Sequence, residues 1–303
     1  MCRMALPTAS RCIITDMEKG RIIRIVSSQY DVLCEQEIVP CIAMGKLRKG
    51  RTPLVGDLVE VERFANQSGI QKILPRRNQL LRPAVANVDQ AIIVMSCRDP
   101  DFSTVLIDRL IFQIVYHDIQ PLLCITKTDL IDENDAIYQT IERYRQSGYP
   151  VYTSNAQAAS GALIAALKGK ISVLTGQSGA GKSSLLNRID PRFQLQTQAI
   201  SKALGRGKHT TRHCELHEIA QGWVADTPGF SSMDFTYMEI GALAAKIPDF
   251  QPYINQCRFR DCVHMHEPDC ALRQAVETGA VAMERYRHYQ EVVTMIKQMK
   301  KKY

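Results

Sequence analysis

A glycine-rich stretch at residues 176–183 has the residue types and spacing of a phosphate-binding loop. It reads Gly-Gln-Ser-Gly-Ala-Gly-Lys-Ser, fits G-x-x-x-x-G-K-[ST], and stands between an apolar run and a predicted helix at 183–188. In such a loop backbone amides surround a phosphate, Lys182 reaches the terminal phosphates, and Ser183 can ligate Mg²⁺. The complete match disfavours a turn that binds nothing. The residues predicted to bind nucleotide are Gly176, Gln177, Ser178, Gly179, Ala180, Gly181, Lys182, Ser183 and Ser184.

A second element can select the base. The tetrad Thr126-Lys127-Thr128-Asp129 follows an apolar strand and resembles the N-K-x-D element of GTPases. The Asp129 carboxylate can accept hydrogen bonds from guanine N1–H and the exocyclic amine, which adenine cannot offer together. The stem of Lys127 can cover the base. Alone, this pattern more often begins a helix, but a phosphate loop in the same sheet favours guanine. Thr126 replaces the usual asparagine, which leaves the contact of that residue open.

Two further segments fit the same nucleotide site. Asp226-Thr227-Pro228-Gly229 follows the apolar residues 223–225. In a D-x-x-G element Asp226 holds Mg²⁺ through water, and the amide of Gly229 senses the γ-phosphate. Residues 154–156 stand where GTPases place a backbone contact to guanine O6. We therefore expect GTP contacts from Asp226 and Gly229.

The segment between the phosphate loop and D-x-x-G offers catalytic candidates. Thr210 or Thr211 is the expected switch threonine, and the sequence does not decide between them. We expect Thr211, Lys182 and Ser183 to be catalytic residues. Phe230 occupies the position after D-x-x-G where many GTPases have a water-orienting glutamine, which predicts slow intrinsic hydrolysis. His209 can orient water instead; the alternative is a solvated or RNA-contacting loop residue.

Residues 257–270 bring together three cysteines and a histidine: Cys257, Cys262, His264 and Cys270. Three thiolates and one imidazole suit a closed tetrahedral Zn²⁺ site with a structural role, because four protein ligands leave no open position for catalysis. Unliganded thiols, or His266 as the fourth ligand, remain alternatives. The ten cysteines are otherwise scattered, which favours a reduced, cytoplasmic protein over a disulfide scaffold.

The elements that must position these residues change character along the chain. Residues 12–75 show short strands broken by turns, at 20–26, 30–34 and 56–61, which predict a small closed barrel, an oligonucleotide-binding (OB) fold or another small barrel. Strands then alternate with helices between 91 and 175, which predicts a parallel sheet with helices on both faces. Helices at 238–247 and 280–301 flank the cysteine cluster. The expected domains are 1–83 (β-barrel), 84–232 (α/β nucleotide domain) and 233–303 (α-helical zinc-binding domain).

The order of the elements is unusual. Ordinary GTPases have the phosphate loop first and the guanine element later, whereas here the tetrad at 126–129 precedes the loop at 176–183. The domain is therefore predicted to be circularly permuted, which a compact domain with nearby termini tolerates. As a consequence, the D-x-x-G segment leads directly into the C-terminal domain.

Charge is distributed in patches along the 303 residues, whose net charge is +7. Residues 44–83 hold nine basic and three acidic side chains, 168–213 nine and one, and 281–303 six and two, whereas 84–150 hold five and ten. Each basic stretch can be solvated surface, but three together favour a nucleic-acid partner. No apolar run approaches the roughly 18 residues of a membrane helix, and we expect no membrane partner.

Together these motifs closely resemble one family, the circularly permuted GTPases of small ribosomal subunit biogenesis known as RsgA. The resemblance spans about residues 12–290 and rests on the order of the motifs at 56–57, 74–78, 126–129, 176–183, 205–211, 226–230 and 257–270. It implies an N-terminal OB barrel, a permuted GTPase domain and a C-terminal zinc domain. It also implies GTP hydrolysis stimulated by the 30S subunit, and a role in the late assembly of that subunit.

The partners expected on this basis are GTP and GDP and the 30S subunit with its 16S rRNA, bound by a monomeric protein with Mg²⁺ and one Zn²⁺. Two alternatives belong to other classes: a phosphotransferase acting on a small molecule or RNA end, and an RNA-binding module that senses GTP without turnover. No acceptor-binding or base-like motif supports the phosphotransferase.

Overall fold

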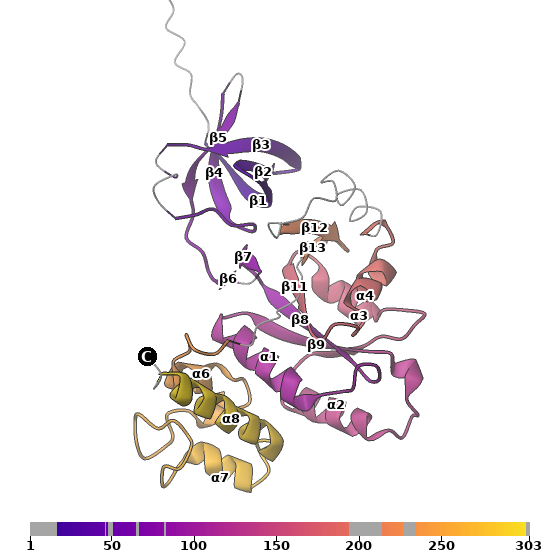
Figure 1. Cartoon of the computed structure of the whole chain (residues 1–303), viewed down its shortest axis with the longest axis vertical. Helices are drawn as coiled ribbons and strands as arrows, with labels where there is room; N and C mark the ends of the chain where they lie inside the picture. The colour runs from indigo at the N-terminus through magenta and orange to yellow at the C-terminus, as the bar shows by residue number, and fades with distance from the viewer. Residues whose placement is uncertain are drawn as a thin grey trace, which may run out of the picture. The chain divides into compact units, whose positions relative to one another are not determined.

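The computed structural model describes residues 17–45, 47, 51–64, 67–81, 83–193, 214–226 and 234–300. They belong to two compact units, Met1–Pro75 and Arg76–Tyr303 (Figure 1). Within the described parts of the chain, no helix combines the length and apolar character needed to cross a bilayer.

The first unit is a five-stranded barrel. Hydrogen bonds connect the strands in the order β1-β2-β3-β5-β4, and β4 pairs again with β1 to close the ring. Alternation decides which side chains enter the barrel, since Val59 and Val61 are buried, as the sequence pattern predicts, whereas Leu58 and Glu60 are not. The strands are β1 (Glu18–Val26), β2 (Gln29–Cys34), β3 (Glu37–Ala43), β4 (Leu58–Arg63) and β5 (Ser68–Ile73).

The second unit begins with a short hairpin, β6 (Gln79–Leu81) and β7 (Ala84–Ala86), and continues as a sheet ordered β10-β9-β8-β11-β13-β12. The neighbours from β10 to β13 are parallel and only β12 is antiparallel, so the predicted parallel sheet is confirmed with one added edge strand. Its strands are β8 (Gln90–Ser96), β9 (Gln120–Thr126), β10 (Val151–Thr153), β11 (Ile171–Thr175), β12 (Glu215–Ile219) and β13 (Gly222–Asp226).

In the described residues, four α-helices connect these strands: α1 (Thr104–Tyr116), α2 (Ala136–Gln146), α3 (Gly161–Leu167) and α4 (Lys182–Ile189). The sequence pattern predicts a helix over 133–146, and α2 begins three residues later, at Ala136. Asp135 causes this start, because its carboxylate accepts a hydrogen bond of 2.9 Å from the Ile137 amide and caps the helix there.

Parallel strands bring the predicted nucleotide elements to one edge of the sheet. The β8–β9 register sets Ser96 opposite Thr126, and the β8–β11 register sets Ile93 opposite Thr175. The tetrad, the phosphate loop and Asp226 therefore all follow strand carboxyl ends, where open α/β sheets bind their ligands.

The C-terminal segment contains α6 (Ile240–Lys246), a 3₁₀ turn η3 (Gln251–Tyr253), α7 (Ala271–Glu277) and α8 (Met283–Lys300). Helix α7 has seven residues, begins directly after the last cysteine of the cluster, and was not predicted from the sequence. Helix α8 packs against α1, and Tyr289 meets Phe112 and Phe250 edge to face, with ring centroids 6.4 and 5.4 Å apart. This segment is therefore part of the second compact unit.

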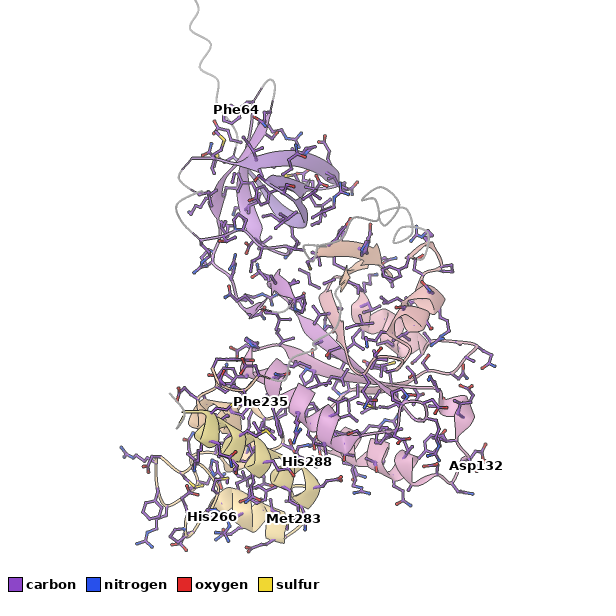
Figure 2. The ribbon with its side chains drawn as sticks, viewed as in Figure 1. Phe64, Asp132, Phe235, His266, Met283 and His288 are labelled. Atoms are coloured by element: carbon purple, nitrogen blue, oxygen red, sulfur yellow. The ribbon has the colours of Figure 1, made fainter. Side chains whose placement is uncertain are left out.

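A buried charged cluster joins α1 to α8. Asp108 of α1 accepts hydrogen bonds from Arg285 (3.1 Å) and Tyr144 (2.9 Å) and contacts His288 Nδ1 at 2.6 Å. Arg285 also donates to Asp249 at 2.6 Å. Figure 2 labels His288 on α8. The charges are paired and hydrogen-bonded, as burial requires.

Candidate nucleotide site and metal centre

The phosphate loop follows β11 and turns into α4. At Gly176 the backbone has φ 127°, and a Cβ there would stand 2.0 Å from the carbonyl oxygen of Val94, so only glycine fits. Gly181 precedes the helix in the left-handed conformation, with φ 89°. Its carbonyl accepts the first helical hydrogen bond, from Leu185 at 2.8 Å. The glycines thus shape the strand–loop–helix geometry that the motif predicts.

Lys182 folds back over this loop. Its ammonium donates to the carbonyl oxygens of Gly176 (2.8 Å) and Gln177 (2.6 Å). Burial lowers the pKa of Lys182 from its ordinary value. An anion beside the ammonium would counter that desolvation, so the position favours a negatively charged ligand.

Thr126 connects the tetrad to the phosphate loop. Its side chain is buried, and its hydroxyl lies 2.6 Å from the carbonyl oxygen of Ala180 and 3.3 Å from that of Met95. A hydroxyl has one hydrogen to donate, and the shorter distance assigns it to Ala180. Threonine in place of asparagine therefore still makes a contact to the loop, which answers the question left open by the sequence.

The remaining tetrad residues contact two neighbouring loops. Lys127 has a left-handed backbone with φ 58°, and its ammonium donates to the carbonyl oxygen of Asp99. Thr128 donates its amide to the carbonyl oxygen of Ser154 at 3.4 Å. Asp129 accepts a 3.1 Å hydrogen bond from the amide of Ala156. The carboxylate acceptor and the amide donor are thus bonded to each other here, and recognition of guanine by these two groups would replace this hydrogen bond.

The stretch Ser154–Ala159, here called the 154 loop, is held in shape by its own side chains. Asn155 Oδ1 accepts hydrogen bonds from the amides of Gln157 (3.0 Å) and Ala158 (2.9 Å). Ser154 donates its hydroxyl to Ala158 O at 3.0 Å and its amide to Ile125 O at 2.8 Å. The loop is thus a compact turn fixed to the end of β9.

Several predicted residues lie outside the described parts of the chain: His209, Thr210, Thr211, Gly229 and Phe230. Asp226 is described by its backbone, as the last residue of β13, one strand away from the end of β11. That position is the carboxyl end of a strand next to the one that carries the phosphate loop. The predicted roles of these residues remain predictions.

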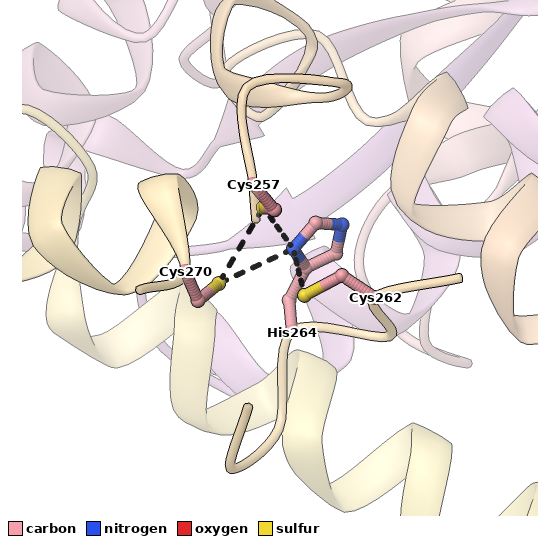
Figure 3. Close-up of side chains that lie close together, drawn as sticks. All are labelled: Cys257, Cys262, His264 and Cys270. Carbon is pink, nitrogen blue, oxygen red and sulfur yellow. Dashed lines mark hydrogen bonds between the residues drawn. The ribbon is translucent and has the colours of Figure 1, made fainter. Parts of the chain in front are cut away.

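The four predicted metal ligands converge (Figure 3). His264 Nδ1 lies 3.5 Å from the sulfurs of Cys257 and Cys262 and 3.4 Å from that of Cys270, and Cys257 and Cys270 are 3.8 Å apart. A tetrahedral zinc with bonds of about 2.3 Å to sulfur and about 2.0–2.1 Å to nitrogen needs S···S near 3.8 Å and S···N near 3.6 Å. The distances match these values, so the cluster can hold a metal ion.

His264 is buried in the cluster, whereas His266 is exposed on the surface (Figure 2). Only His264 belongs to the ligand group, which decides between the two candidate histidines in the described structure. Burial raises the pKa of the Cys262 thiol to about 12 and lowers the pKa of His264. The imidazole is therefore neutral and ready to ligate, and thiolates form there at neutral pH when a cation compensates their charge.

Residues around the cluster fix its loop. The Glu267 carboxylate accepts hydrogen bonds from the amides of Met265 (2.7 Å) and His266 (3.0 Å). Tyr286 and Tyr289 of α8 donate their hydroxyls to the carbonyl oxygens of His264 (2.7 Å) and Val263 (3.0 Å). The metal loop is therefore attached to α8, and α8 to α1.

Tertiary structure adds contacts that no motif predicts. Asp99, in the loop after β8, holds Lys127 through its carbonyl oxygen, and Arg188 of α4 donates to Ser154. Both lie far in sequence from the residues they contact and outside the recognised patterns. Their only sequence signals are polar residues next to predicted elements, which many surface positions share.

Comparison with known proteins supports the same interpretation. The RsgA GTPase family model matches residues 73–236, and the RsgA N-terminal domain model matches residues 19–70. Relatives from Shouchella clausii (strain KSM-K16) and Bacillus subtilis (strain 168), both named small ribosomal subunit biogenesis GTPase RsgA, are 47% and 46% identical over 293 and 298 residues. Each alignment covers 95% of this chain and 100% of the relative.

Solved structures agree. The crystal structure of YloQ, described as a circularly permuted GTPase, matches with a TM-score of 0.81 at 40% identity, over 96% of this chain and 99% of that chain. YjeQ from Thermotoga maritima matches with a TM-score of 0.79 at 33% identity, over 92% and 98% of the two chains. Along the chain, the tetrad after β9 precedes the phosphate loop after β11, and the D-x-x-G segment begins at the end of β13, which is the permuted order that the sequence predicts. The chain therefore belongs to the RsgA family of circularly permuted GTPases, enzymes that hydrolyse GTP.

Proposed function

We propose that GTP binds at the sheet edge formed by the phosphate loop and the tetrad. The observation that carries this proposal is the 2.6 Å hydrogen bond from Thr126 to the carbonyl oxygen of Ala180, which joins a base-binding element to a phosphate-binding element. Asp129 and the Ala156 amide, 3.1 Å apart, recognise the guanine edge. The stem of Lys127 covers the base.

Hydrolysis on this site depends on positioning and on charge stabilisation, as phosphoryl transfer generally does. The loop amides and Lys182 bind the phosphate oxygens, and the ammonium exchanges its loop carbonyl partners for them. Ser183 and Asp226 would hold Mg²⁺, which neutralises phosphate charge when bound. Thr211 or Thr210 orders the switch segment, Gly229 contacts the γ-phosphate, and His209 orients the attacking water in place of the glutamine replaced by Phe230.

We propose one structural Zn²⁺ on Cys257, Cys262, His264 and Cys270. The sulfur and nitrogen spacing supports this. Four protein ligands also complete a tetrahedral set, as in structural zinc sites. The metal fixes the loop 257–270, which α8 attaches to the nucleotide domain.

We further propose that this cytoplasmic GTPase binds the 30S ribosomal subunit and its 16S rRNA as a monomer, assists late maturation, and hydrolyses GTP faster on the subunit. The names of its relatives support a role in small-subunit biogenesis. The patches of basic residues at 44–83, 168–213 and 281–303 support contact with RNA.

The test is GTP turnover with added 30S, 50S or 70S particles. We expect slow turnover alone and a rise specific to 30S, with Lys182→Ala inactive under all conditions. Unchanged turnover with 30S would contradict the proposed activation. A product formed on an added acceptor would indicate a phosphotransferase, and the absence of turnover throughout would indicate a pure GTP sensor.

A further inference from the structure

Arg188 is a half-buried arginine near the end of α4, outside every motif identified in the sequence. Its Nη2 donates a hydrogen bond of 3.2 Å to the hydroxyl oxygen of Ser154. Its Nε is buried and has no hydrogen-bond partner in the described part of the chain. Desolvation of a guanidinium nitrogen without a partner costs free energy. A neutral apolar residue would avoid that cost, so the contact to Ser154 requires an explanation.

Ser154 is a junction between the tetrad and the 154 loop. It is buried, its amide donates to Ile125 at the end of β9, and its carbonyl accepts from the Thr128 amide. Arg188 adds a third contact to Ser154, from α4, the helix that begins at the phosphate loop. Among these contacts, Arg188 alone connects the 154 loop to α4.

The 154 loop is held together internally, because Asn155 accepts hydrogen bonds from the amides of Gln157 and Ala158. Its Ala156 amide donates to the Asp129 carboxylate at 3.1 Å, a hydrogen bond that a bound guanine would replace. An amide donor can recognise guanine O6, whereas the carboxylate recognises N1–H and the 2-amino group. The position of Ser154 therefore sets the position of one half of the base-recognition pair.

We propose that Arg188 is a positioning residue for guanine recognition: it holds the 154 loop at a fixed distance from the phosphate-loop helix, so that the Ala156 amide meets O6 while the phosphates are bound. This inference rests on the proposed nucleotide site. Arg188 touches neither base nor phosphate and acts through Ser154.

The test uses the full-length chain and Arg188→Gln, with displacement of a fluorescent guanine nucleotide by three unlabelled diphosphates. GDP carries both O6 and the 2-amino group, inosine diphosphate keeps O6 but lacks the amine, and the 2-aminopurine nucleotide lacks O6. Loss of one neutral hydrogen bond, about 1 kcal/mol, predicts affinities for GDP and inosine diphosphate about fivefold weaker, with the 2-aminopurine affinity unchanged. The ratio of GDP to inosine diphosphate affinity should stay constant.

Arg192→Gln is the matched control, because Arg192 is exposed and pairs with Asp190 outside the 154 loop. It should behave as wild type. A double-mutant cycle with Ser154→Ala should show non-additive losses, since both substitutions remove the same contact.

A parallel loss of affinity for all three nucleotides, or additive losses in the cycle, would overturn the positioning role. Failure of the proposed site itself has another signature: wild type would bind ATP as well as GTP, whatever residue occupies position 188. The melting temperature of each variant separates misfolding from a local effect, and Arg188→Lys serves where the glutamine variant does not fold.

Discussion

At the scale of single residues, the nucleotide site depends on a few polar contacts at the ends of strands. Thr126 and Asp129 belong to one tetrad but serve different partners, the phosphate loop and the 154 loop respectively. Thr126 donates to the carbonyl oxygen of Ala180, and Asp129 accepts from the amide of Ala156. Substitutions here should therefore change specificity before they change stability.

Asp129→Asn is predicted to reverse base preference. The amide keeps one acceptor but presents a donor where guanine also has donors, so two charge-assisted hydrogen bonds are lost. We expect GTP to bind on the order of 100-fold more weakly, and xanthine nucleotide, which has an acceptor at position 2, to bind better than GTP. Competition titrations with GTP, xanthosine triphosphate and ATP measure this. Equal competition by ATP and GTP in the wild type would refute guanine selection by Asp129.

At the scale of elements, α1 and α8 meet through charges that have no access to water. The Arg285 guanidinium packs against the rings of Tyr144 and Tyr149, with its Cζ 4.7 Å from each ring centroid. It is paired with Asp108 and Asp249. Burial raises the pKa of both tyrosines above their ordinary value, so both hydroxyls stay protonated and donate to the aspartates. The cluster specifies how these helices dock.

Asp108→Asn should destabilise the second unit. The substitution leaves Arg285 with one counter-ion in a buried site, for which the cost of breaking a buried pair is roughly 3–5 kcal/mol. Asp118→Asn is the control, because Asp118 lies just beyond α1 and forms a more exposed ion pair with Lys246, where the expected loss is below about 1 kcal/mol. Urea unfolding of both variants measures the difference. Similar midpoints for the two would show that the buried cluster contributes little.

Metal removal should loosen the loop 257–270 while the nucleotide site persists. Freshly purified protein is expected to carry about one zinc per chain, and Cys262→Ser should lose it. Hydrogen exchange should become fast at 257–277, whereas α8 keeps protection through its packing on α1, and GTP affinity should be largely unchanged. Cys214→Ser, outside the cluster, controls for loss of a thiol. A Cys262→Ser variant unable to bind GTP would argue against independence of the two sites.

At the scale of the whole molecule, the chain consists of a barrel unit ending at Pro75 and a larger unit that contains both the nucleotide site and the metal cluster. The C-terminal helices pack on α1 within that larger unit. The domain limits at 83 and 233 expected from the sequence remain a prediction. Binding to a large RNA surface and response to nucleotide are properties of the complete chain.

Removal of the barrel is predicted to abolish the response to 30S particles and to leave zinc and GTP binding intact. Residues 76–303 should retain zinc and GTP, because both sites lie in that unit, but should lose turnover stimulated by 30S particles. Binding of the full chain to 30S should weaken with salt by roughly 0.7–0.9 log units per log[salt] for each phosphate contacted. Turnover assays and sedimentation at several salt concentrations measure both effects. Full stimulation of residues 76–303 would show that the barrel's basic residues only solvate its surface.

The affinity of the protein for the 30S subunit should depend on the bound nucleotide. The D-x-x-G segment leads into the C-terminal helices, so affinity for 30S should differ between a non-hydrolysable GTP analogue and GDP. A ligand shifts a state only through differential affinity, so the coupling must appear as a measurable ratio. Sedimentation with each nucleotide across a protein titration tests it. Equal binding to 30S with both nucleotides would show that the bound nucleotide does not control affinity for the subunit.

The sequence alone determined the chemistry and its order. The glycine spacing of the phosphate loop, the carboxylate of Asp129 and the three cysteines of 257–270 are local patterns, and the alternation at 58–61 predicts which side chains enter the barrel. Each depends on residues that are close in sequence, so each can be predicted without knowledge of the tertiary structure. The permutation, too, is visible as an order of motifs along the chain.

Only the tertiary structure decided which side chains meet across the fold. The Thr126–Ala180 contact, the Arg188–Ser154 contact and the Asp108–Arg285 pair join residues 54, 34 and 177 positions apart. Strand order and helix docking create these neighbours, and no periodicity records them. The choice of His264 over His266 was likewise made by burial, because residues two positions apart in a loop face different surroundings that the sequence does not reveal.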